Sequence, residues 1–401
     1  MINLNIELAG GLKLTYYSQK HPFLFARCTN PYTNESYLRT LYPGVTGYIR
    51  IHYFCPWRIE LFDPLNTYID ITLNYENCIA GFLFASSALG DTLAWVPLIN
   101  DWAERNNVQK IYVKTNWNFL FDKNEYPKIV WLEDSDQFLN IPGLRLIHTV
   151  GHAPNPEILK NKRLNHATAV NWQETNMFDS QNYSLGLPSQ EIKPKLTQLP
   201  PERLINKPYV TICKEASQKI KHILNPQAWL ALSYRLKELG YEVVSVGNQP
   251  SIIPEVVNSN GTSFDKVMRL IRDAEFHIGV SSGLSWLAWA YNKHVLMLGN
   301  FTHPGYEFSS KVVRVIDQSL SWGLFNDPHT PWVPEWQFDP ENDNVQIARR
   351  ISAAHALKGL DTLISLKKSN SMEGLYITED FQLHKIEKLQ PKEFPDYLTK
   401  T

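Results

Sequence analysis

The chain has 401 residues, of which 43% are hydrophobic and 20% charged, as in globular proteins of about two or three domains. Its formal net charge of −1 gives no electrostatic reason to expect binding to nucleic acid or to an anionic membrane. The four cysteines, Cys28, Cys55, Cys78 and Cys213, lack the spacing of a zinc or disulfide framework, which predicts reduced thiols. No stretch approaches about 18 uncharged apolar residues, and the start lacks a signal-peptide pattern, so we expect no membrane span and no leader.

Residues 1–76 are predicted to form a small β-rich domain. Apolar and polar residues alternate at 48–54, 57–63 and 67–73, which predicts three strands. The last two runs flank turn residues at 64–66, a pattern that predicts a hairpin.

Residues 77–200 are predicted to form a Rossmann-like domain with a linker. A buried-type strand is followed by a loop of small residues, a helix and a second strand, which predicts a parallel sheet. The strands are expected at 79–85, 110–114, 128–132 and 144–148, and the helix at 92–106. Residues 151–208 are polar and rich in proline and asparagine, so we expect loops there, with a linker at 185–201.

A second Rossmann-like domain is predicted at 201–345, because strands and helices alternate again. Strands are expected at 209–213, 241–247, 277–280 and 294–298, and helices at 227–239, 263–271 and 284–290. Gly240 is expected to end the first helix and Ser263 to cap the second. Residues 346–401 are expected to form C-terminal helices, placed at 346–368, and a tail.

The most informative stretch is 276–290, where a short strand turns through Ser281, Ser282 and Gly283 into an apolar helix. Such a turn presents backbone N–H groups and the positive end of a helix dipole, which suits a phosphate or diphosphate. The alternative is an ordinary turn with a serine N-cap, and the stretch on its own favours that alternative.

Two further loops follow predicted strands, where open parallel sheets bind their ligands. Asp91 could act as a general base on an acceptor hydroxyl, or could equally cap a helix that begins at Thr92. Lys214, Lys219 and Lys221 could neutralise a diphosphate, although each taken singly fits a solvated basic loop better. Together a base, lysines and a diphosphate turn describe transfer from a nucleotide sugar, and the lack of a DxD loop favours metal independence.

At these residues the chain resembles the bacterial autotransporter heptosyltransferases, relatives of the lipopolysaccharide heptosyltransferases. The likeness is carried by 87–95, 185–195, 221–229, 278–290, 301–304 and 336–343. It implies a GT-B fold, that is, two Rossmann-like domains facing a cleft, here preceded by a β-rich domain that recruits the acceptor. It also implies inverting transfer of heptose from ADP-heptose to serine hydroxyls of an adhesin passenger domain in the cytoplasm.

The resemblance implies that Asp91 is the catalytic base and that Lys221 contacts the phosphates. The turn at Ser281, Ser282 and Gly283 would hold the diphosphate. The donor site is further predicted to include Leu284 and Gly247, and the acceptor side Gly90, Thr92 and Thr302.

The sequence departs from the pattern of this family in one respect. Members of the family carry C-terminal cysteines that bind iron and support a ring-like oligomer, whereas residues 321–357 here contain no cysteine. We therefore expect no iron site and no cofactor, and the oligomeric state stays open.

Two rival functions remain. The first is a heptosyltransferase for lipopolysaccharide or another glycan, or a transferase for another nucleotide sugar. The second is an inactive, glycosyltransferase-like binding protein. The β-rich start argues against a lipopolysaccharide or glycan heptosyltransferase, while the choice of nucleotide sugar stays open. The combination of Asp91, Lys221 and the serine turn argues against the second.

Overall fold

The computed structural model describes residues 2–7, 12–48, 54–84, 87–150, 164–165, 175–216, 225–248, 253, 256–299, 303–316 and 351–387. Within these ranges the chain divides into two compact units, each treated by itself below. The first unit contains residues 1–87 and 94–197, and the second contains 88–93 together with 198–389. The short segment 88–93 therefore belongs to the same unit as the second predicted Rossmann-like domain.

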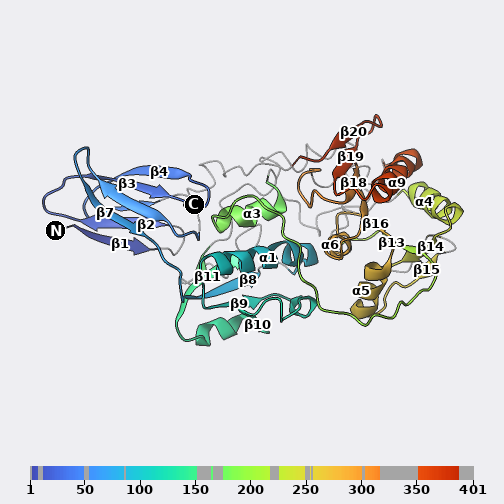
Figure 1. Ribbon diagram of the computed structural model, residues 1–401, viewed down its shortest axis with the longest axis horizontal. Coiled ribbons are helices and arrows are strands. Elements are labelled where there is room, and N and C mark those ends of the chain that lie inside the picture. The colour runs from blue at the N-terminus through green and yellow to red at the C-terminus, as the bar shows by residue number, and fades with distance from the viewer. Residues whose placement is uncertain are drawn as a thin grey trace, which may run out of the picture. The chain divides into compact units, whose positions relative to one another are not determined.

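The N-terminal region is built from two antiparallel sheets, shown in blue in Figure 1, which confirms that it is β-rich; strands β1 to β4 were not predicted. The three-stranded sheet contains β1 (Asn3–Glu7), β2 (Lys13–Tyr17) and β5 (Thr46–Tyr48), and the four-stranded sheet contains β3 (Leu24–Thr29), β4 (Ser36–Leu41), β6 (Arg58–Phe62) and β7 (Thr67–Thr72). Strands β6 and β7 form the predicted hairpin, with Ile59 opposite Ile71. The predicted strand at 48–54 falls mostly outside the described residues.

A five-stranded parallel sheet follows in the first unit, with strand order β10-β9-β8-β11-β12. Its strands are β8 (Ile79–Phe84), β9 (Lys110–Lys114), β10 (Ile129–Leu132), β11 (Leu144–Val150) and β12 (Leu164–Asn165). Helix α1 (Leu89–Arg105) follows β8, and two 3-10 turns, η1 (Asn118–Leu120) and η2 (Ser135–Asn140), complete the region. These strands confirm the parallel sheet predicted for this part of the chain.

The expectation of loops throughout 151–208 is wrong at helix α3 (Met177–Ser184), a polar segment that is nevertheless buried. Hydrogen bonds account for this burial. Asn176 caps the helix through Phe178 N, and Trp95 Nε1 donates to Met177 O over 2.7 Å. Polar composition indicated a surface loop, but a buried polar group is tolerated where it is hydrogen-bonded.

The second unit contains an eight-stranded sheet in the order β15-β14-β13-β16-β17-β18-β19-β20. Its strands are β13 (Tyr209–Cys213), β14 (Glu242–Ser245), β15 (Val257–Asn258), β16 (His277–Gly279), β17 (Val295–Leu298), β18 (Val312–Val315), β19 (Gly374–Ile377) and β20 (Leu383–Lys385). All neighbours are parallel except β19 and β20. Strands β18 to β20 are absent from the predicted elements because they are only three or four residues long and lack a clear alternation.

The helices described beside this sheet are α4 (Pro226–Glu238), α5 (Phe264–Asp273), α6 (Gly283–Ala290) and α9 (Ala353–Lys368). Ser263 caps α5 by accepting from Lys266 N, and Gly240 has a φ of 85°, so both predicted helix ends are confirmed.

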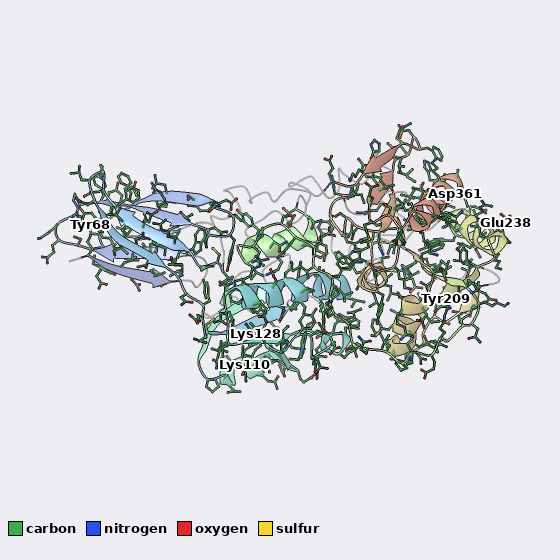
Figure 2. All side chains as sticks on the ribbon, in the orientation of Figure 1. Tyr68, Lys110, Lys128, Tyr209, Glu238 and Asp361 are labelled. Atoms are coloured by element: carbon green, nitrogen blue, oxygen red, sulfur yellow. The ribbon has the colours of Figure 1, made fainter. Side chains whose placement is uncertain are left out.

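Helices α4 and α9 lie side by side, as Figures 1 and 2 show, and share one apolar core with the sheet. Arg235 of α4 pairs with Glu238 over 3.2 Å and approaches Asp361 of α9 at 4.0 Å. None of the helices within the described ranges is long and apolar enough to cross a membrane.

Candidate active site

The strand order of the second unit reverses direction between β13 and β16, which are neighbours although they are not consecutive in sequence. In doubly wound sheets, ligands bind beyond the carboxyl ends of the strands at this reversal. Glu215 follows β13, and the turn from Ser281 to Gly283 follows β16. The predicted diphosphate turn therefore stands at the point of the sheet where a ligand is expected.

The turn leads directly into α6, which begins at Gly283 with Ser282 at the N-cap position. The Ser282 side chain makes no capping bond, and its buried hydroxyl has no hydrogen-bond partner among the described residues. The hydroxyl of Ser281 does not cap the helix, since it donates to Glu307 Oε1 instead. The first N–H groups of a helix have no intrahelical acceptor. Because neither serine side chain caps α6, the alternative of an ordinary serine N-cap does not hold.

Behind this turn lies a buried ion pair between Glu307 and Arg314, whose side chains are 2% and 1% exposed. Arg314 Nη1 also donates to His303 O over 2.7 Å. Burial lowers the pKa of the Arg314 guanidinium, and the Glu307 carboxylate opposes that shift. Burial together with the nearby Arg314 charge lowers the pKa of His303 to about 4, so this ring is neutral at pH 7.

This ion pair was not predicted from the sequence, although one signal for it is visible. Arg314 interrupts the otherwise apolar strand Val312–Val315, in which every residue is buried. A charged side chain at such a position requires a buried partner, because an unpaired charge costs several kcal/mol or more to bury. Its partner Glu307 lies in a loop whose sequence carries no periodicity.

Asp91 lies in the first turn of α1 and is 5% exposed. The helix begins at Leu89, so the alternative in which Asp91 caps a helix starting at Thr92 does not hold. Burial first, and then the negative charges of Asp91 and Glu307, raise the pKa of the Tyr306 hydroxyl well above its ordinary value. Asp91 is thus a buried carboxylate close enough to Tyr306 to act on its ionisation.

Two glycines allow the first turn of α1 to pack closely against α6. A Cβ atom at Gly90 would lie 2.7 Å from Trp286 Cδ1, and one at Gly283 would lie 2.8 Å from Leu89 Cβ. No larger side chain fits at either position without movement of its neighbour. Because these contacts lie within one unit, they place the first turn of α1 and the serine turn in the same packed region.

The remaining predicted residues are placed as follows. Thr92 is buried and donates to Ala88 O over 3.3 Å, and Leu284 is partly buried in the first turn of α6. Gly247 follows β14 with a φ of 154°, and a Cβ atom there would lie 3.1 Å from Glu215 Oε2. Lys221 and Thr302 lie outside the described residues.

Glu215 is a further carboxylate that the sequence argument passed over in favour of the lysines around it. Its Oε2 accepts a hydrogen bond from Asn248 N over 3.0 Å. An acidic side chain at the carboxyl end of a Rossmann strand suits the hydroxyl groups of a ribose. Its position directly after a buried strand was the signal available in the sequence.

Comparison with known proteins supports the class that this geometry indicates. Residues 144–307 match the profile of glycosyltransferase family 9 (heptosyltransferase). The autotransporter heptosyltransferase Aah of Escherichia coli is 26% identical over 272 residues, which cover 64% of this chain and 66% of Aah, just under two thirds of that protein. The inactive autotransporter heptosyltransferase BimC of Burkholderia thailandensis is 31% identical over 154 residues, or 36% of each protein.

Among solved structures, the iron-containing dodecameric glycosyltransferase TibC from enterotoxigenic E. coli H10407 shares the fold, with a TM-score of 0.67 at 21% identity. The match covers 90% of this chain and 96% of TibC. A second structure of TibC contains ADP-D-β-D-heptose. These findings show that the chain has the GT-B fold, in which the solved structures are glycosyltransferases. More particularly, the chain is similar to the heptosyltransferases of family 9, and the autotransporter heptosyltransferases match it over most of its length.

The comparison corrects the expectation that no cofactor takes part. TibC is described as iron-containing, which contradicts that expectation for a chain of this fold. The described ranges contain no group of three or more His, Cys, Asp or Glu side chains that could hold a metal ion. The four cysteines are buried, and burial raises the thiol pKa of Cys28 and Cys213 to about 12, which opposes the thiolate form that binds metals. Residues 317–350 lie outside the described ranges.

Proposed function

We propose that this chain transfers heptose from ADP-heptose to serine hydroxyl groups of an autotransporter protein in the cytoplasm. The observation that carries the proposal is the packing of a buried carboxylate, Asp91, in the same region as the Ser281–Gly283 turn, at a sheet reversal suited to a nucleotide. The proposal also draws on Aah, an autotransporter heptosyltransferase, and on TibC, which has been solved with ADP-heptose.

In the proposed reaction Asp91 accepts the proton of the acceptor hydroxyl. The acceptor oxygen attacks the anomeric carbon from the face opposite the diphosphate, and the bond from that carbon to the diphosphate oxygen breaks, so the configuration inverts. ADP leaves with the bonding electrons. The N–H groups at the start of α6 and the Ser282 hydroxyl stabilise its charge, with Lys221 as a further contact.

Three other residues have assigned roles on the donor side. Glu215, beside Gly247, accepts hydrogen bonds from the ribose hydroxyls of the nucleotide. The Glu307–Arg314 pair holds Ser281 and so fixes the shape of the turn. The N-terminal β-rich region recruits the protein acceptor, and Gly90 and Thr92 border the acceptor side; the sequence alone assigns Thr302 to that side.

The test has two stages. Thermal-shift titration with ADP-heptose, GDP-mannose and UDP-glucose measures donor choice, and mass spectrometry of an autotransporter passenger domain after incubation measures transfer. We expect stabilisation by ADP-heptose alone, and one or more added heptose masses on the protein. Stabilisation by another nucleotide sugar would overturn the donor assignment, and mass added to a lipid A precursor but not to the protein would overturn the acceptor assignment.

The second candidate function is a binding protein without transferase activity, which is favoured by the similarity to the inactive BimC. The two functions differ in one measurement. A binding protein would be stabilised by ADP-heptose yet release no ADP, whereas a transferase releases ADP when acceptor is added. Asp91→Asn should therefore abolish ADP release while stabilisation by ADP-heptose persists. Asp101→Asn lies on the same helix and loses only contacts with Arg105 and Gln190, so it should still release ADP.

A further inference from the structure

The opposite edge of the eight-stranded sheet, where the strands begin, carries a cavity of about 580 Å³. Residues from the starts of β16, β17 and β18 and from the ends of α5, α6 and α9 border it. A volume of this size is typical of sites for small molecules. It is bordered by Arg203, Arg272, Asp273, Ala274, Glu275, Asn292, Lys293, His294, Lys311, Lys367 and Asn370.

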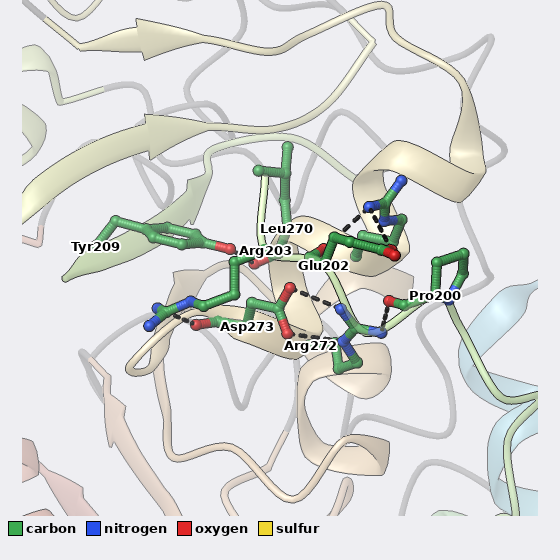
Figure 3. Close-up of polar contacts among 8 residues, drawn as sticks. Pro200, Glu202, Arg203, Tyr209, Leu270, Arg272 and Asp273 are labelled. Carbon is green, nitrogen blue, oxygen red and sulfur yellow. Dashed lines mark hydrogen bonds and ion pairs between the residues drawn. The ribbon is translucent and has the colours of Figure 1, made fainter. Parts of the chain in front are cut away.

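Five of these side chains are cationic and two are acidic, and the two acids are already paired. Arg272 binds the Asp273 carboxylate through two N–H groups, each over 2.7 Å, and also donates to Pro200 O (Figure 3). Lys367 Nζ lies 2.7 Å from Glu275 Oε2. The cavity is therefore left with three cations, Arg203, Lys293 and Lys311, that no bordering carboxylate contacts.

Backbone carbonyl groups satisfy these three cations only in part. Arg203 donates to the carbonyl oxygen of Asp273 over 3.1 Å, as Figure 3 shows, and Lys311 Nζ lies 3.4 Å from Asn292 O. No hydrogen bond or ion pair of Lys293 Nζ is found within the described ranges. Burial lowers the pKa of this ammonium group, although Asp273 and Glu275 oppose the shift. The charge of Lys293 is therefore incompletely compensated.

Helix dipoles offset some of the excess charge, but not all of it. Three helices, α5, α6 and α9, end at the cavity, and each C-terminus is equivalent to about half a negative charge. Their sum is about 1.5 negative charges against three unpaired cations. A positive charge of about 1.5 therefore remains in a concave site.

A second, independent observation is the backbone conformation of Lys311. It is 7% exposed and has a φ of 53°, a conformation that costs about 1 kcal/mol or more for a residue with a Cβ atom. Asn292 and Asn370 share this conformation, but they follow helix ends, where asparagine is common. Lys311 precedes a strand, where no capping role explains the strain. Such strain is concentrated at ligand sites.

We propose that this cavity binds a small phosphorylated molecule, whose phosphate group contacts Arg203, Lys293 and Lys311. The site is separate from the donor site, because it lies at the amino edge of the sheet whose carboxyl edge carries the serine turn. The shape of the site favours a small ligand, because the cations border a hollow and do not form a flat surface.

The probe is inorganic pyrophosphate, titrated by calorimetry into the full chain in saturating ADP, which occupies the proposed donor site. We expect one pyrophosphate site in the wild-type chain. Lys293→Gln and Lys311→Gln should each weaken its affinity by about tenfold or more, because each removes a charge-assisted hydrogen bond. Lys293→Arg, which keeps the charge, should retain most of the affinity.

The matched control is Lys358→Gln, an exposed lysine on α9 that does not border the cavity. It should leave pyrophosphate binding unchanged. The proposal is overturned if the wild-type chain binds no pyrophosphate in the presence of ADP, or if the control and the cavity variants lose affinity equally. Thermal melts identify any variant that fails to fold. The ADP-release assay tests the transferase separately, so failure of either proposal is distinguishable from failure of the other.

Discussion

The two edges of the eight-stranded sheet differ in whether their charged side chains are paired. At the carboxyl edge, the charges of Glu307 and Arg314 are buried against each other, and two glycines leave room for the Trp286 and Leu89 side chains between neighbouring helices. At the amino edge, cations outnumber acids around an open cavity. A buried, paired charge fixes a shape at a cost in desolvation, whereas an unpaired charge in a hollow is available to a ligand.

The two proposals therefore assign two kinds of anion site to one sheet. The first is a turn that leads into the N-terminus of α6, and the second is a set of lysine and arginine side chains around a cavity. The first kind suits a reaction in which charge develops at a defined atom. The second suits binding without chemistry. Four substitutions test the buried groups on which this comparison depends, from the largest expected effect to the smallest.

Asp91→Asn should have the largest effect on the reaction. The amide keeps the size of the side chain but cannot accept the acceptor's proton, so kcat should fall by about 10²–10⁴-fold while ADP binding persists. The measurement is the initial rate of ADP release, with ADP affinity determined by calorimetry. Loss of ADP affinity together with kcat would show that Asp91 supports the fold of the site and is not its base.

Glu307→Leu should have the largest effect on stability. It leaves the Arg314 charge buried without its carboxylate, which costs about 3–5 kcal/mol of unfolding free energy. Urea unfolding measures this loss. The double variant Glu307→Leu, Arg314→Met removes both charges and should recover a large part of it. A double variant no more stable than the single one would refute the account of this pair as a balanced buried charge.

Gly90→Ala should act on both stability and donor affinity. Its Cβ atom meets the Trp286 ring, and overpacking of this kind costs about 1–3 kcal/mol. Gly359→Ala is the matched control, since its Cβ atom would lie 2.5 Å from Val315 Cγ2, away from the serine turn. Both variants should lower the melting temperature, but only Gly90→Ala should weaken ADP binding. If both variants changed the affinity for ADP equally, the packing of Gly90 against Trp286 would have no specific effect on the donor site.

His277, the first residue of β16, should make stability depend on pH. It is fully buried, and burial lowers its pKa from 6.5 to about 3. Between these values the unfolded chain binds the proton and the folded chain does not, so acidification from pH 6.5 towards pH 3 should reduce stability by about 1.4 kcal/mol per pH unit. His277→Gln should reduce this slope, as measured by urea unfolding at pH 7, 6 and 5. His384→Gln, which removes an exposed histidine on β20, should leave the slope unchanged.

Much of the fold could be predicted because its signals are local. The alternating strands at Arg58–Phe62 and Thr67–Thr72, the cap at Ser263 and the helix end at Gly240 each depend on residues within a few positions of one another. The strand–turn–helix at 277–290 could be recognised for the same reason. Helix α3 was missed because its polar residues are buried by hydrogen bonds to distant parts of the chain.

By itself, the sequence determined most of the strands and helices, the helix ends at Ser263 and Gly240, the serine turn and the identity of the acidic residue in α1. Only the tertiary structure decided which side chains these elements meet. The bond from Ser281 to Glu307 joins residues 26 positions apart, and the contact of Gly90 with Trp286 joins residues even further apart. The cavity at the amino edge collects residues from 203 to 370. The physical reason is that periodicity reports which face of an element is buried, whereas the partner on the other side of that face depends on how the whole chain packs.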